Sequence, residues 1–156
     1  MWEALKEIVR NPPQPDTAAE TQPPFPPSPD DIQALQYDTF EELVAALYLA
    51  RGYTTELTQD GADRGVDVLV SDSTRTVAIQ AKRYSKGNRV GVRPVRQIVG
   101  AAAECGADNT AVATTSTFTA PAEETAGKLD VTLINGERCC KLIANSPPWV
   151  RETFGL

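Results

Sequence analysis

Apolar residues recur at helical spacing between residues 37 and 51, at positions Phe40, Leu43, Val44, Leu47 and Tyr48. This spacing predicts an amphipathic helix with one apolar face. Asp38 or Thr39 can cap its amino terminus, and Gly52 is placed to end it.

The pattern then changes to that of strands. Residues 53–58 alternate between apolar and polar, and residues 66–70 are rich in valine. Residues 75–82 are the next strand, with polar turns between the three segments. These segments predict three consecutive strands in a meander. A basic loop follows over residues 83–92.

The second half predicts a helix from Pro94 to about Cys105, a strand over 110–115 and a helix from the cap Thr119 to about residue 127. A short strand at 131–134 and a last helix at 136–144 complete the order α-β-β-β-α-β-α-β-α. We therefore expect an α/β fold, with a mixed sheet flanked by helices on both faces.

The amino-terminal segment has a different character. Residues 1–10 predict a short amphipathic helix, and residues 11–30 form a linker that contains eight of the twelve prolines. The folded domain is expected over 31–144, with 145–156 as a tail. A short helix on a stiff linker is suited to docking on a partner subunit.

Composition narrows the chemistry. The chain has no histidine, which excludes Ser-His-Asp nucleophilic systems and His-ligated zinc. Its three cysteines form no CxxC pair, and Cys139 and Cys140 are expected to be buried filler. No apolar run is long enough to span a membrane and no signal peptide is evident, so a cytoplasmic location is expected.

Charge is unevenly distributed. The net charge is −6, yet residues 75–96 hold seven basic side chains and no acidic one, which leaves −13 elsewhere. A basic patch on an acidic body predicts contact with nucleic-acid phosphates, while a merely solvated surface stays an alternative.

Three polar residues stand within the apolar strands. Alternation along residues 75–82 places Gln80 and Lys82 on one face, and Asp67 lies in the preceding valine-rich strand. If the strands are neighbours, oxygen atoms of Asp67 and Gln80 can bind Mg²⁺, with Lys82 beside them. A purely structural salt bridge between Asp67 and Lys82 is the alternative.

Several segments in order resemble the Mrr-like type IV restriction endonucleases of the PD-(D/E)xK superfamily. They are FEELV at 40–44, GY at 52–53, DRGVDV at 63–68, IQAKRY at 79–84, TTSTFT at 114–119 and LING at 133–136. The resemblance spans about residues 39–143. It implies a restriction-endonuclease-like αβββαβ core and a DNA endonuclease that restricts foreign or modified DNA.

The resemblance also implies roles by position. Asp67 and Gln80 match the metal ligands, Lys82 the catalytic lysine, and Glu41 the helix glutamate that supports the metal site. The metal would be Mg²⁺, with Mn²⁺ as a possible substitute. Arg64 stands where relatives often have glycine, and could add a phosphate contact.

Double-stranded DNA is the expected partner. Candidate contacts are the basic residues Arg83, Lys86, Arg89, Arg93 and Arg96, together with Thr115 and Thr117 before a helix amino terminus. Two alternatives remain at this point: a Holliday-junction resolvase acting as a homodimer, and a non-catalytic DNA-binding or adaptor module.

Overall fold

The computed structural model describes residues 25–58 and 65–156. The expected helix at 1–10, most of the linker and Arg64 lie outside the described residues.

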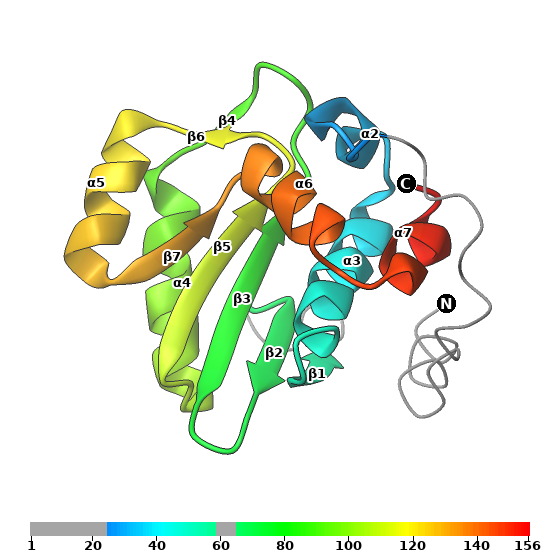
Figure 1. Cartoon of the computed structure of the whole chain (residues 1–156). Helices are drawn as coiled ribbons and strands as arrows, with labels where there is room; N and C mark the ends of the chain where they lie inside the picture. The colour runs from blue at the N-terminus through cyan, green and yellow to red at the C-terminus, as the bar shows by residue number, and fades with distance from the viewer. Residues whose placement is uncertain (1–24, 59–64) are drawn as a thin grey trace.

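A five-stranded mixed sheet forms the centre of the protein (Figure 1). Its strands are β1 (Thr54–Leu57), β2 (Val68–Ser71), β3 (Thr76–Lys82), β5 (Asn109–Thr114) and β7 (Val131–Ile134), in the spatial order β1-β2-β3-β5-β7. The first three strands pair antiparallel, and β3, β5 and β7 pair parallel. The predicted meander and mixed sheet are confirmed.

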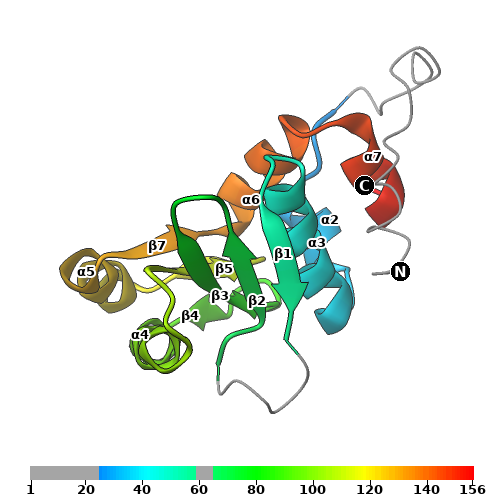
Figure 2. The ribbon, with the colours of Figure 1, turned by 90° about the horizontal axis from the view of Figure 1, so that it is seen from below.

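Helices cover both faces of the sheet (Figure 2). On one face lie α3 (Tyr37–Leu49), α6 (Gly136–Ala144) and α7 (Pro148–Phe154), and on the other lie α4 (Val92–Cys105) and α5 (Ala120–Leu129). Strand β3 is buried on both sides: Val77, Ile79 and Ala81 pack toward α3, and Ala78 packs toward α4. The alternation predicted for this strand therefore holds, and it directs Gln80 and Lys82 to the α4 face.

The carboxyl-terminal segment corrects an expectation. Residues 145–156 were expected to be a tail, but α7 lies within them and is part of the core. Val150 is 0% exposed and Phe154 is 7% exposed, both within the cluster beneath α3. The buried Arg151 donates a hydrogen bond to the carbonyl oxygen of Phe25, at 2.8 Å. Helix α7 is part of the core because its apolar side chains pack against α3.

Three smaller elements were not predicted. Helix α2 (Pro29–Gln33) begins at Ser28, whose hydroxyl and amide form a capping box with Asp31. Within the expected basic loop, β4 (Arg89–Val90) pairs in parallel with β6 (Thr117–Phe118) as a separate two-stranded sheet. These pieces lie over the ends of β3 and β5 (Figure 1).

One predicted cap is wrong. Helix α3 has Gln36 at its N-cap position with no side-chain cap, and the carboxylate of Asp38 accepts from the amide of Thr39 instead. No helix among residues 25–58 and 65–156 is long and apolar enough to cross a bilayer.

Candidate active site

Asp67 lies immediately before β2, between β1 and β3. Its amide donates to the carbonyl oxygen of Ile79 at 2.9 Å, and its carbonyl accepts from the amide of Thr58 at 3.0 Å. The carboxylate Oδ2 accepts from the amide of Ala81 at 2.8 Å. These contacts hold the half-buried carboxylate beside residues 79–81 of β3, as the predicted meander requires.

Gln80 is a deeply buried polar residue of β3. Its side chain is 2% exposed, and its Nε2 donates to Oε1 of Gln97 at 3.3 Å. The Oε1 atom is buried and has no hydrogen-bond partner in the described part of the chain. An unsatisfied buried carbonyl of this kind costs about 1–3 kcal/mol, so its retention points to a ligand.

Lys82 ends β3 on the same face as Gln80. It is half-buried and pairs with Thr114 of β5. The hydroxyl of Thr114 donates to the carbonyl oxygen of Lys82 at 2.6 Å. This bond holds the backbone at the strand end, which limits the volume that the ammonium group can reach.

The donor set fits a hard cation held by few carboxylates. Among residues 25–58 and 65–156, no group of three or more His, Cys, Asp or Glu side chains is arranged to hold a metal. A site here would therefore combine the Asp67 carboxylate with the amide oxygen of Gln80. Such oxygen ligands suit Mg²⁺, which keeps several water ligands of its own.

Glu41 lies on α3, which covers the face of the sheet opposite to Gln80. Its side chain is half-buried, and its predicted support of the metal stays a prediction. The adjacent Glu42 is also half-buried, and this burial raises the pKa of its carboxyl above the usual value.

Gln97 is a site residue that the sequence did not reveal. It lies on α4 among residues whose pattern predicted only which side chains point inward, namely Val95, Ile98, Val99 and Ala102. Nothing in that pattern marks Gln97, because its partner Gln80 is seventeen positions away. The one available signal for such a partner was that a buried Gln80 amide needs a hydrogen-bond acceptor.

The predicted DNA contacts separate into two groups. Exposed side chains are Lys86, Arg89, Arg93, Arg96 and Thr117. Arg83 is half-buried, and its guanidinium donates to the carbonyl oxygen of Gln33 at 3.0 Å. A cleft of about 590 Å³ runs along this loop, lined by Arg83, Tyr84, Ser85, Gly87, Asn88 and Arg89.

Thr115 requires a correction. It is 0% exposed, its hydroxyl donates to the carbonyl oxygen of Tyr84 at 2.7 Å, and it accepts from the Tyr84 amide at 3.0 Å. Gln33 also donates to its carbonyl oxygen. A buried hydroxyl that is already bonded twice holds the loop after β3 and is not available to DNA.

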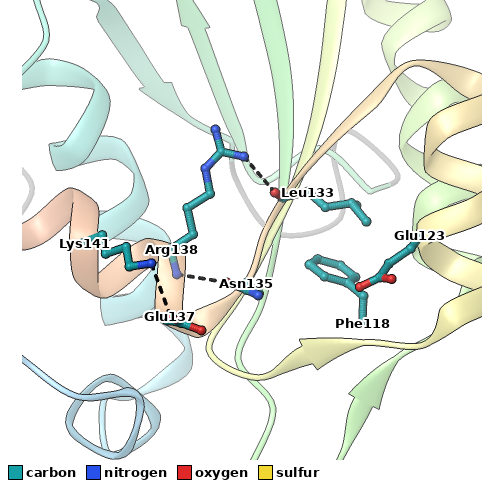
Figure 3. Close-up of a pocket in the computed structure, with 7 residues that line it drawn as sticks. All are labelled: Phe118, Glu123, Leu133, Asn135, Glu137, Arg138 and Lys141. Atoms are coloured by element: carbon teal, nitrogen blue, oxygen red, sulfur yellow. Dashed lines mark hydrogen bonds and ion pairs between the residues drawn. The ribbon is translucent and has the colours of Figure 1, made fainter.

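A second pocket lies between β6, α5, β7 and α6 (Figure 3). It has a volume of about 350 Å³ and shares no residue with the group around Asp67. Three of its charged side chains bond within the fold: Arg138 donates to the carbonyl oxygen of Leu133 at 3.2 Å, and Lys141 lies 3.2 Å from the Glu137 carboxylate.

The two cysteines of α6 add no nucleophile to the site. Cys139 and Cys140 are 0% and 6% exposed, which confirms their expected burial. Burial raises the pKa of Cys139 to about 12 and that of Cys140 to about 11, so both remain thiols near neutral pH.

Comparison with known proteins identifies a matching family. The sequence profile of a family described as restriction endonuclease, the Mrr catalytic domain, matches residues 32–143. No curated protein sequence matches the chain.

Solved structures share the fold at low sequence identity. The modification-dependent restriction endonuclease AspBHI is 21% identical with a TM-score of 0.58, covering 99% of this chain and 38% of its own. MspJI restriction endonuclease, solved with a 27-mer oligonucleotide, is 12% identical with a TM-score of 0.50, covering 98% and 34%. The protein of unknown function AF1548 is 17% identical with a TM-score of 0.51, covering 64% and 57%. The chain thus spans between a third and just over half of these structures.

Proposed function

Because the chain belongs to the Mrr-type restriction endonuclease family, we propose that it is a DNA endonuclease that hydrolyses phosphodiester bonds with a divalent metal ion, Mg²⁺ in the first place. The observation that carries the proposal is the buried Oε1 of Gln80, which has no hydrogen-bond partner in the described part of the chain. The next residue of β3, Ala81, donates its amide to the Asp67 carboxylate, so both oxygen groups belong to the same stretch of the sheet. A buried carbonyl oxygen without a partner is unfavourable, and a bound cation would satisfy it.

Each residue of the group has a distinct task. The Asp67 carboxylate and Gln80 Oε1 would hold the ion, which supplies Lewis-acid polarisation of a phosphoryl oxygen and a more acidic water. Lys82 carries a positive charge at the end of β3 and would donate hydrogen bonds to the attacking water or to a phosphate oxygen. Since that phosphate gains negative charge in the transition state, Lys82 would stabilise it more than the ground state.

The exposed basic residues would position the DNA backbone. Arg93 precedes Gln97 by four residues, so it lies one turn away on the same face of α4 as the Gln80 contact. Lys86, Arg89 and Arg96 extend this positive surface. Four phosphate contacts predict that the logarithm of affinity falls with the logarithm of salt concentration with a slope of about −3.6.

The next part of the proposal concerns the DNA target and the assembly of the protein. We propose that the target is foreign or modified DNA, since AspBHI is named as modification-dependent. We propose that a further domain, a partner subunit or a homodimer contributes to target recognition. A partner subunit docked on residues 1–10 would supply this, and a symmetric dimer would place two sites on opposite strands.

The test is plasmid cleavage with Mg²⁺ or Mn²⁺ by wild type, Lys82→Ala and Lys128→Ala. Lys128 is a matched control, because it is an exposed lysine on α5 paired with Glu124. Lys82→Ala is expected to lose at least about a hundredfold in rate, as for other groups that stabilise transition-state charge. Lys128→Ala should cleave as wild type does.

Methylated and unmethylated plasmids, each at low and molar salt, extend the assay. Preferential cleavage of one methylation state would support restriction of modified DNA. Wild-type protein that binds DNA and cleaves it with neither metal would contradict the proposal and favour a DNA-binding module. Preference for branched DNA by a dimer would instead favour junction resolution.

A further inference from the structure

We propose that Gln97 is a positioning residue, which orients the Gln80 amide so that its oxygen faces the metal. This inference rests on the proposed function and deepens it. As a positioning residue, Gln97 on α4 would contact neither the metal nor the DNA.

The argument begins with the two ends of an amide. A glutamine side chain presents a carbonyl oxygen at one end and an NH₂ group at the other, and a half-turn about its last bond exchanges them. For Gln80 the end that faces the site decides whether the site attracts or repels a cation. The bond from Gln80 Nε2 to Gln97 Oε1, at 3.3 Å, engages the NH₂ end and leaves Oε1 as the buried atom without a partner.

The same side chain contacts the turn that precedes Asp67. A Cβ atom built on Gly65 would lie 3.0 Å from Cγ and 3.1 Å from Cδ of Gln97. Gly65 also has φ +114°, a conformation that favours glycine. Gln97 thus packs on the segment that leads to Asp67 while it bonds to Gln80, and so links the two strands that supply the proposed ligands.

Exposure separates this role from ordinary core packing. Gln97 is an exposed residue, whereas Val95 and Ile98 beside it are 0% exposed and anchor α4 to the sheet. An exposed glutamine on a helix usually bonds to water. This one turns inward to a group that is 2% exposed, so its replacement would release the Gln80 amide without opening the core.

Metal binding without DNA tests the inference independently of catalysis. Titration calorimetry with Mn²⁺ would compare wild type with Gln97→Met, which keeps the length of the side chain but has no strong acceptor, and with Gln97→Glu, which keeps the acceptor. Glu104→Gln, at an exposed position near the other end of α4, is the control.

Gln97→Met is expected to bind Mn²⁺ about tenfold more weakly, the lower end for an outer-shell partner of a metal ligand. Gln97→Glu and Glu104→Gln should bind at least as tightly as wild type. In cleavage assays Gln97→Met should need a correspondingly higher metal concentration, and excess metal should restore its rate.

Two results would overturn the inference while leaving the nuclease in place. The first is that Gln97→Met binds Mn²⁺ as tightly as wild type does, while wild type cleaves DNA. The second is that Gln97→Glu binds Mn²⁺ as weakly as Gln97→Met does, because the acceptor oxygen at position 97 would then have no effect on metal binding. A wild type that neither binds Mn²⁺ nor cleaves would remove the proposed function itself, and this inference with it.

Discussion

Replacement of Gln80 by methionine should stabilise the metal-free protein and at the same time abolish its metal binding. The two side chains have similar length and volume, so the substitution conserves the packing between β3 and α4. What changes is polarity at a place that is 2% exposed.

The magnitude follows from two opposing terms. The buried Oε1 without a partner costs about 1–3 kcal/mol, which the substitution removes. The hydrogen bond to Gln97 contributes about 0.5–1.5 kcal/mol, which the substitution loses. Since Gln97 is exposed and can bond to water instead, we expect a net gain of about 0.5–2 kcal/mol. For a chain of this length, each kcal/mol raises Tm by about 2–4 °C.

The assay is thermal unfolding in a chelator and then in excess Mg²⁺. In chelator, Gln80→Met should melt a few degrees above wild type. At a metal concentration of one hundred times Kd, wild type should gain about 2.7 kcal/mol from binding, and Gln80→Met should gain almost nothing. The order of the two melting temperatures should therefore reverse when metal is added.

Gln33→Met serves as the matched control. Gln33 is half-buried, its Nε2 donates to the carbonyl oxygen of Thr115 at 3.1 Å, and its amide oxygen is not among the buried atoms without a partner. Its replacement should lower stability by about 1 kcal/mol. If Gln80→Met lowers Tm in chelator just as Gln33→Met does, the Gln80 oxygen is satisfied in the folded protein and the argument for a ligand there is refuted.

Three further predictions concern the fold and its reactive groups. Gly136→Ala should destabilise the protein strongly or prevent folding, because the new Cβ would lie 2.3 Å from the carbonyl oxygen of Thr115; denaturant unfolding measures the loss. Val150→Ala should cost about 2 kcal/mol by the same measurement, and a change near zero would show that α7 is not part of the core. In native protein at pH 8 a thiol reagent should label the exposed Cys105 alone, and the two buried cysteines of α6 should react only after unfolding, as mass spectrometry can count.

Local sequence determined the regular elements, because their signals lie within a few residues. Alternation in residues 75–82 predicted which side chains of β3 share a face, and it placed Gln80 with Lys82. The short connection between β2 and β3 makes them neighbours, so the approach of Asp67 to β3 was also predictable. The helix at 136–144 and the strand at 131–134 have the predicted bounds.

The membership of the chain in its family was equally visible, because a few spaced motifs carry it. The family profile covers residues 32–143, close to the predicted span of 39–143. The sequence pattern could not extend this to α7, since a short segment with two prolines has weak helical periodicity and only its burial against α3 makes it part of the domain.

Only the tertiary structure decided what the predicted residues contact. Thr115 stood in a hydroxyl-rich loop that suggested phosphate binding, yet the approach of Tyr84 buries it. Arg83 counted toward the basic patch, yet α2 offers it a carbonyl oxygen. Gln97 carried no signal at all, and became part of the site because α4 packs across β3. Periodicity along one segment reports which face a residue occupies, whereas its partner comes from another segment, and that pairing exists only once the chain has folded.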